Sequence, residues 1–278
     1  MRLALLLLIA TSVVQAQQVQ SFRRVDGQSI PAMVFPPTGI CHGTAILSHG
    51  AGGTERGLRY MAEHLQSKGW LVVTVGHAES GPDVLRAELM KSFGLREGLR
   101  DGLGRMLADA DAFNARFNDI QAALDWSKGR CSNPFTALIG HSMGAATTLL
   151  LAGANNRLGL KTQIAFNAYV AMSAQGVGAL FPKDAWQAIK APVYVLTGTK
   201  DQAQNGDWTT RLAIYRSLPA GCAWQGVIEG ANHMAFGRGG NTEEKELITG
   251  SVSAFLSAVK NGQCNRAYKK PGIAMLQK

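Results

Sequence analysis

The fold is decided by the stretch Thr136-Ala137-Leu138-Ile139-Gly140-His141-Ser142-Met143-Gly144. Its first four residues form an apolar strand, and the stretch from Ala145 to Ala152 that follows favours a helix. The pattern Gly-x-Ser-x-Gly at such a junction makes a sharp strand-to-helix turn, which strains the backbone of the serine and needs small flanking residues. The pattern therefore predicts that the hydroxyl of Ser142 stands alone above a sheet, where it can act as a nucleophile.

Outward from this turn, short apolar runs alternate with amphipathic stretches. This alternation is typical of an α/β fold with a mostly parallel central sheet, here of about eight strands, and helices on both faces. Helices are predicted from Thr54, as the N-cap, to Gly69, from about Asp119 to Lys128, and from about Thr242. The predicted strands are Ile30 to Phe35, Thr44 to Ser48, Leu71 to Val75, Thr136 to Ile139, Tyr169 to Met172, Val193 to Thr197 and Trp224 to Ile228, with Val19 to Val25 as an edge strand.

The chain contains no internal repeat and no linker rich in Pro, Gly or Ser, so residues 17–278 are predicted to form a single domain. Residues 80–118 are too long for a simple connection and carry apolar residues at helical spacing. We expect helices there, either as ordinary surface helices or as a helical lid over a pocket. The basic tail, residues 265–278, is expected to be loosely held.

The first residues are typical of a secretory signal peptide. Arg2 is followed by an apolar run from Leu3 to Val14, and small residues stand at the cleavage positions that end in Ala16. This run is shorter than the roughly 20 apolar residues of a membrane-spanning helix, and no other segment could span a bilayer. We therefore predict a signal peptide at residues 1–16 and a secreted or periplasmic protein after cleavage near Ala16.

The composition bounds the function further. A chain that is 46% hydrophobic and 17% charged can bury a large core. The formal net charge is +9, but no Lys/Arg cluster interleaved with aromatic residues concentrates it. Nucleic-acid binding is therefore not expected, because it requires basic charge on one face.

A serine hydroxyl is a poor nucleophile at neutral pH, so Ser142 needs a base and a group that orients that base. Among six histidines, only His233 follows the last predicted strand. Asp201 stands at the carboxyl end of the preceding strand, where catalytic groups collect in parallel sheets. Asp207, in the same loop, is the alternative acid. The chain order serine, acid, histidine is the order found in the fold that carries its nucleophile on a Gly-x-Ser-x-Gly turn.

Hydrolysis also needs hydrogen-bond donors for the oxyanion of the tetrahedral intermediate. The Gly-rich loop Ser48-His49-Gly50-Ala51-Gly52-Gly53 directly follows an apolar strand, where it would face Ser142. We predict the backbone N–H groups of Met143 and Ala51 as the donors, with Gly52 as the alternative to Ala51. Residues near these loops are expected to line the pocket; they are Met143, Trp208, Met234 and Phe236.

Four features of the chain together resemble the α/β-hydrolase superfamily. The turn Gly140-His141-Ser142-Met143-Gly144 resembles its nucleophile elbow, and the His-Gly-Ala-Gly-Gly run at residues 49–53 resembles its oxyanion loop. Asp201 and His233 fall where its acid and base fall. Within it, the chain is similar to exported dienelactone-hydrolase-like and platelet-activating-factor-acetylhydrolase-like serine esterases. Gly76-His77-Ala78-Glu79-Ser80 resembles the His-Pro-Gly-Ser turn of that branch but departs from it at Ala78 and Glu79.

The resemblance implies an exported serine hydrolase, a carboxylesterase, that cleaves carboxylic esters through an acyl-enzyme intermediate. It implies a small-molecule or lipid-like ester substrate, no cofactor and no metal. A peptidase or an acyltransferase on the same scaffold, or a catalytically silent binding protein, are the alternatives.

The chain has four cysteines, and their spacing is not that of a metal site; they are Cys41, Cys131, Cys222 and Cys264. In an exported chain, an even number of cysteines is expected to pair, here as two disulfides. The strand order implied by the resemblance makes the strands after Cys41 and Cys131 neighbours. It also brings the end of the last helix, at Cys264, beside the strand that Cys222 precedes. The resemblance therefore implies the pairs Cys41–Cys131 and Cys222–Cys264.

Overall fold

A computed structural model describes residues 18–91, 95–203, 206–266 and 268–278. The predicted signal peptide, residues 1–16, lies outside these ranges. None of the helices within them is long and apolar enough to cross a membrane.

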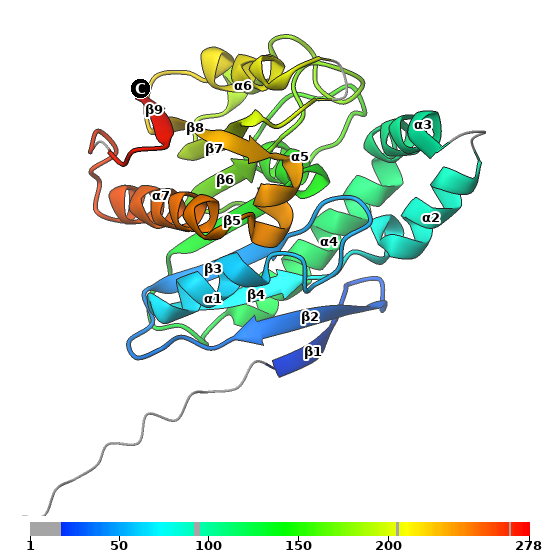
Figure 1. The fold of residues 1–278 in the computed structure, drawn as a ribbon. Helices are drawn as coiled ribbons and strands as arrows, with labels where there is room; N and C mark the ends of the chain where they lie inside the picture. The colour runs from blue at the N-terminus through cyan, green and yellow to red at the C-terminus, as the bar shows by residue number, and fades with distance from the viewer. Residues whose placement is uncertain (1–17, 92–94, 204–205, 267) are drawn as a thin grey trace, which may run out of the picture.

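The centre of the structure is a nine-stranded sheet with the order β1-β2-β4-β3-β5-β6-β7-β8-β9 (Figure 1). The strands from β4 to β8 in this order run parallel, while β1, β2 and β9 pair antiparallel with their neighbours. The expected α/β fold with a mostly parallel sheet is therefore confirmed. The strands are β1 (Gln18–Arg23), β2 (Ser29–Phe35), β3 (Gly43–Ser48), β4 (Trp70–Val75), β5 (Thr136–His141), β6 (Ala168–Met172), β7 (Val193–Lys200), β8 (Ala223–Asn232) and β9 (Ile273–Gln277).

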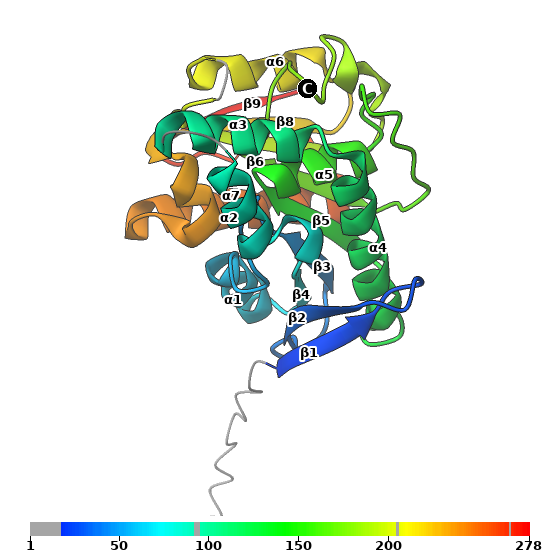
Figure 2. The ribbon, with the colours of Figure 1, turned by 90° about the vertical axis from the view of Figure 1, so that its right-hand side faces the viewer.

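Helices cover both faces of the sheet (Figures 1 and 2). The buried side chains of α1 and α7 share one core with one face, and those of α4, α5 and α6 share a second core with the other. Strands β3, β4 and β6 lie between the two cores and are buried along their whole length, which explains why they are continuous apolar runs. The helices are α1 (Arg59–Ser67), α2 (Pro82–Met90), α3 (Leu95–Leu107), α4 (Ala110–Ser127), α5 (Met143–Leu151), α6 (Leu212–Ser217) and α7 (Thr242–Lys260).

The described part of residues 80–118 is mostly helical, as its spacing predicts. It holds α2, α3 and the first half of α4, which Asp109 caps by accepting hydrogen bonds from two amides of the first turn. Helices α2 and α3 pack against each other, and Arg105 of α3 donates to Glu88 of α2 over 2.6 Å. Figure 2 shows this pair in front of the edge at which the parallel strands end.

The prediction that Thr54 caps the first helix is wrong. Helix α1 begins at Arg59, after the N-cap residue Leu58. Thr54 instead closes a turn, because its carbonyl accepts from the amide of Gly57 over 2.9 Å. The loop that follows β3 is therefore longer than expected, and this length lets it reach over the edge of the sheet.

The C-terminal tail is not loosely held, contrary to expectation. Ile273–Gln277 form β9, which pairs antiparallel with β8 and adds the ninth strand. Two backbone hydrogen bonds of 3.0 Å between Ala223 and Lys278 extend this pairing. The strand is short and only half-buried, so its sequence lacks the strong apolar run by which the other strands are recognised.

Both disulfides have the pairing implied by the resemblance, Cys41–Cys131 and Cys222–Cys264. The first joins the segments that enter the neighbouring parallel strands β3 and β5. The second joins the start of β8 to the segment after α7. Both bridges lie at the amino-terminal ends of the strands, whereas Ser142 lies at the carboxyl ends. The disulfides therefore stabilise the scaffold without occupying the site.

Candidate active site

Ser142 occupies the turn between β5 and α5, where its backbone has a φ of 56° and a ψ of −118°. Both flanking glycines are required by this turn. A Cβ at Gly140 would lie 2.1 Å from the carbonyl oxygen of Gly144, and a Cβ at Gly144 would lie 2.1 Å from that of Ser48. The strained turn presents the half-buried hydroxyl of Ser142 to a cavity at the carboxyl edge of the sheet.

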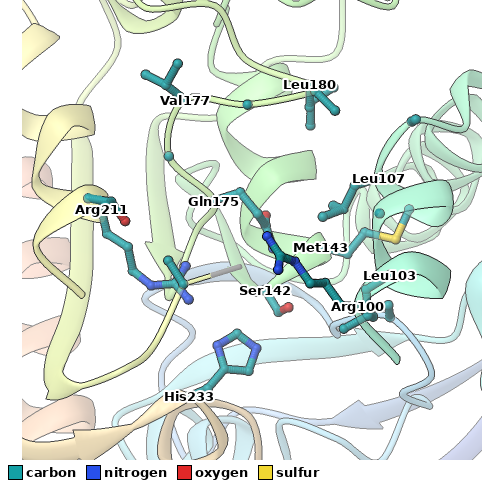
Figure 3. A pocket seen from close by; sticks show the side chains of 18 of the residues that line it. Arg100, Leu103, Leu107, Ser142, Met143, Gln175, Val177, Leu180, Arg211 and His233 are labelled. Atoms are coloured by element: carbon teal, nitrogen blue, oxygen red, sulfur yellow. The ribbon is translucent and has the colours of Figure 1, made fainter. Parts of the chain in front are cut away.

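Asp201 and His233 directly follow β7 and β8, which are parallel neighbours, and their side chains meet there. Asp201 Oδ1 lies 3.1 Å from His233 Nδ1. The carboxylate is fully buried, whereas the imidazole is 34% exposed. His233 and Ser142 line the same cavity, and Figure 3 shows both side chains there.

Ser173, at the end of β6, is a site residue that the sequence analysis missed. Its Oγ lies 2.8 Å from Asp201 Oδ1 and 2.6 Å from His233 Nδ1. If the hydroxyl donates to the carboxylate, its oxygen accepts from the imidazole, which puts the proton on Nδ1 and leaves a lone pair on Nε2. Ser173 has a φ of 56°, and the only other non-glycine residue with a positive φ among the described residues is Ser142. No local sequence pattern marks Ser173.

Two further side chains hold Asp201 in its ionised form. Thr197 Oγ1 donates to Oδ2 over 2.9 Å, and Arg211 Nη2 lies 3.0 Å from Oδ1. Burial acts to raise the pKa of Asp201, but the hydrogen bond from His233, the charge of Arg211 and the hydrogen bond from Ser173 hold that pKa below its usual value. The carboxylate therefore stays charged and can stabilise a protonated imidazole.

Asp207, the alternative acid, lies elsewhere. It is exposed and accepts from the amide of Thr209 over 2.9 Å, so it caps the short helical turn Trp208–Arg211. Its contacts are local because loop aspartates bond readily to the backbone two residues on. The structure thus brings Asp201, and not Asp207, to His233.

Ala51 and Met143 line the cavity beside Ser142, and both are candidates for the oxyanion hole. Among the described residues, neither backbone N–H has a hydrogen-bond acceptor. Gly52, the alternative donor, is already engaged, because its N–H donates to the carbonyl of Ser80 over 2.8 Å. Met143 also begins helix α5, whose amino-terminal end favours negative charge.

His141 lies behind the cavity and does not line it. Its Nε2 donates to the carbonyl of His233 over 3.0 Å, so it supports the loop that carries this imidazole. Burial lowers the pKa of His141 to about 3, and the ring is therefore neutral at neutral pH. His141 is a supporting side chain, and His233 is the histidine at the cavity.

The cavity has a volume of about 900 Å³, and α3 contributes one of its walls. Part of the lining is apolar and consists of Leu103, Leu107, Met143 and Leu180. Figure 3 shows Arg100 of α3 reaching over the cavity. Within residues 80–118, helix α3 therefore contributes to the pocket directly.

Three of the four predicted pocket residues do not line the cavity; only Met143 does. Phe236 is fully buried in the core shared with α1, where its carbonyl accepts from the Tyr60 hydroxyl over 2.9 Å. Met234 is 49% exposed and precedes the helical turn Ala235–Gly239. Trp208 begins the turn capped by Asp207, and only the later residues of that turn reach the cavity. Nearness in sequence to His233 or Asp201 does not decide which way a side chain points.

No protein-family model and no curated protein matches the sequence. Among solved structures, the chain is similar to the esterase Pf2001 of Pyrococcus furiosus, with a TM-score of 0.58, 15% identity, and 87% of this chain and 92% of that chain covered. It is also similar to the esterase domain of a Rhodothermus marinus protein, with a TM-score of 0.57, 14% identity, and 88% of this chain and 99% of that chain covered. With the sheet order described above, these similarities show that the chain has the α/β-hydrolase fold.

Proposed function

We propose that this protein is an exported serine hydrolase that cleaves carboxylic esters. One observation carries the proposal. A serine on a strained, glycine-flanked turn shares a cavity with an imidazole that is hydrogen-bonded over 3.1 Å to a buried carboxylate. This combination of nucleophile, base and orienting acid is what acyl transfer through a serine requires. The printed names of the two structural neighbours, both esterases, agree with it.

In the proposed mechanism, Ser142 Oγ attacks the ester carbonyl carbon while His233 Nε2 takes the hydroxyl proton. The carbonyl oxygen becomes an oxyanion and accepts hydrogen bonds from the N–H groups of Ala51 and Met143. The intermediate collapses, the bond to the alcohol oxygen breaks, and His233 gives its proton to the leaving alcohol. Water, activated by the same imidazole, then hydrolyses the acyl-enzyme and restores Ser142.

Asp201 holds the imidazole in the tautomer that this mechanism needs. Its carboxylate attracts the Nδ1 proton directly and through Ser173, so Nε2 faces the cavity as a base. When His233 becomes an imidazolium, the charge of Asp201 stabilises it. Because Arg211 and Thr197 fix the carboxylate, little reorganisation is needed during the reaction.

The cavity favours an ester with an apolar part of moderate size, because leucine, methionine, valine and alanine side chains form much of its lining. Two disulfides suit an oxidising compartment, which supports the proposed export. The narrower resemblance to dienelactone-hydrolase-like and platelet-activating-factor-acetylhydrolase-like esterases is part of this proposal.

The proposed function is tested by labelling with a fluorophosphonate and then measuring hydrolysis of a graded series of p-nitrophenyl esters beside the matching anilides. We expect labelling of one serine and turnover of esters well above that of anilides. Faster cleavage of anilides would indicate a peptidase, and transfer to an added alcohol in preference to water would indicate an acyltransferase. Absence of both labelling and turnover would refute the proposal in favour of a silent binding protein.

The wall formed by α3 leads to a prediction about acyl length. Leu103→Trp places a larger side chain in the cavity, so we expect kcat/KM for a long-chain ester to fall by at least about tenfold relative to that for the acetate ester. The ratio of the two kcat/KM values is the measurement. Ala87→Trp, at an exposed position of α2, is the matched control and should leave this ratio unchanged. An unchanged ratio in Leu103→Trp would mean that the substrate does not contact α3.

A further inference from the structure

A cluster of buried polar side chains lies beneath the oxyanion loop, residues 49–53, and has no part in the mechanism above. Its members are Ser48, His77, Arg116 and Asp119, and none of their side chains is more than 2% exposed. They form a chain of hydrogen bonds. Ser48 Oγ donates to His77 Nε2 over 2.8 Å, and His77 Nδ1 donates to Asp119 Oδ2 over 2.8 Å. This chain is sealed from the cavity, so it cannot act on a substrate directly.

Arg116, from α4, connects this cluster to the oxyanion loop. Its Nη1 donates to the carbonyl of His49 over 2.8 Å and to Ser48 Oγ over 3.3 Å, and its Nη2 lies 3.5 Å from the carbonyl of Gly50. Its Nε donates over 2.8 Å to Ser80 Oγ, the residue whose carbonyl accepts from Gly52. The guanidinium therefore holds the backbone on both sides of Ala51. It contacts the carbonyls of His49 and Gly50 before Ala51, and it contacts Ser80, which binds Gly52 after it.

The geometry of the peptide unit gives these contacts a consequence for Ala51. The carbonyl of Gly50 and the N–H of Ala51 belong to one planar trans peptide, so they point in opposite directions. The carbonyl of Gly50 accepts from three groups, the Gly53 N–H at 3.1 Å, His49 Nδ1 at 2.6 Å and Arg116 at 3.5 Å. With the carbonyl held on the protein side, the N–H of Ala51 must face the cavity.

The energetic cost of Arg116 supports a functional reason for it. The side chain is fully buried, and among the described residues it makes no direct ion pair with a carboxylate. Burial lowers the pKa of Arg116 to about 9, although the charges of Asp119 and Glu79 act to raise that pKa, so the guanidinium is still charged at neutral pH. A buried charge bonded mainly to carbonyls and hydroxyls is unfavourable compared with an apolar side chain of the same size.

We propose that Arg116 is a positioning residue of the oxyanion hole, which orients the Ala51 N–H by holding the carbonyls of His49 and Gly50. This inference rests on the proposed esterase function. Arg116 does not touch the substrate, and it acts through the peptide that links Gly50 to Ala51. Its loss should therefore weaken stabilisation of the oxyanion more than it weakens substrate binding.

The test compares an ester with its thionoester, in which sulfur replaces the carbonyl oxygen. Sulfur is a weak hydrogen-bond acceptor, so a working oxyanion hole favours the oxygen ester. In Arg116→Met, we expect kcat for the oxygen ester to fall on the order of 100-fold with little change in KM, and the ratio of kcat values for oxygen and sulfur esters to fall with it. Arg116→Lys keeps a charge but has a single donor atom, and should show a smaller fall of the same ratio.

Arg24→Met is the matched control, because Arg24 is also buried beside this cluster, where it contacts Asp119, Glu79 and Asp26 but no carbonyl of the oxyanion loop. Arg24→Met should lower Tm by a similar amount, yet its oxygen-to-sulfur ratio should stay at the wild-type value. A ratio that is unchanged in both Arg116 variants, or that falls equally in Arg24→Met, overturns the inference while wild-type ester hydrolysis still stands. If the wild type hydrolyses no ester and takes no fluorophosphonate label, the proposed function fails first and this inference fails with it.

Discussion

Ser142→Ala is expected to lower kcat for ester hydrolysis by about 10⁴- to 10⁶-fold and to abolish fluorophosphonate labelling. The variant lacks the hydroxyl oxygen that forms the proposed acyl-enzyme. Its Tm should stay within a few degrees of the wild type, because the alanine keeps the same Cβ and the same strained φ of 56°. Steady-state kinetics, mass spectrometry of the labelled protein and thermal unfolding provide the three measurements.

Ser173→Ala is the matched control for this variant. Ser173 is the other serine with a φ of 56° beside His233, but it is fully buried and cannot receive a substrate. We expect a reduced kcat, since one hydrogen bond to the imidazole is lost, and preserved labelling at Ser142. Substantial activity in Ser142→Ala, or transfer of the label to another residue, would show that the nucleophile is wrongly assigned.

Asp201→Asn should lower kcat by about 10⁴-fold. The asparagine amide can donate to Nδ1 of His233, which favours the tautomer with the proton on Nε2. In that tautomer Nε2 has no lone pair with which to take the proton of Ser142. Asp207→Asn is the natural comparison. Asparagine caps a helical turn nearly as well as aspartate, so this exposed substitution should leave both kcat and Tm almost unchanged. The reverse result, a loss of activity in Asp207→Asn alone, would contradict the assignment of the acid.

Asp201→Asn should also lower Tm, and the pH dependence of this loss can be worked out from the pKa. The pKa of Asp201 is lower in the folded protein than in the unfolded chain, so its ionisation stabilises the fold above the unfolded value of about 4. That contribution is lost as the pH falls through the lower, folded pKa. The difference in Tm between wild type and variant should therefore be largest near neutral pH and shrink below about pH 4.

The elbow and the strands around it could be predicted because they depend on local chemistry. Gly140 and Gly144 are needed wherever a strand turns so sharply into a helix, and the structure places a backbone oxygen 2.1 Å from either missing Cβ. The two-sided burial of β3 and β4 requires unbroken apolar runs, which are visible in the sequence. Strand β9 escaped prediction because an edge strand that is only half-buried needs no such run.

The supporting side chains of the site could not be predicted, because their partners are distant in sequence. Ser173 meets His233 from a position 60 residues away, and Arg116 meets the carbonyl of His49 from 67 residues away. A serine or an arginine in isolation has no pattern that indicates such a partner. The choice of Ala51 over Gly52 as the open donor likewise depends on the carbonyl of Ser80, which occupies the Gly52 amide.

The sequence by itself determined the alternation of strands and helices, the sharp turn that exposes Ser142, and the order in which Ser142, Asp201 and His233 follow the ends of their strands along the chain. These features follow from side-chain periodicity and from the steric needs of single residues, which act within a few positions. Only the tertiary structure decided that Asp201 and not Asp207 reaches His233, and that α3 contributes to the lining of the cavity while Trp208, Met234 and Phe236 do not. It also decided that a buried arginine lies under the oxyanion loop. Those outcomes depend on the direction of a side chain relative to distant backbone, and packing sets that direction.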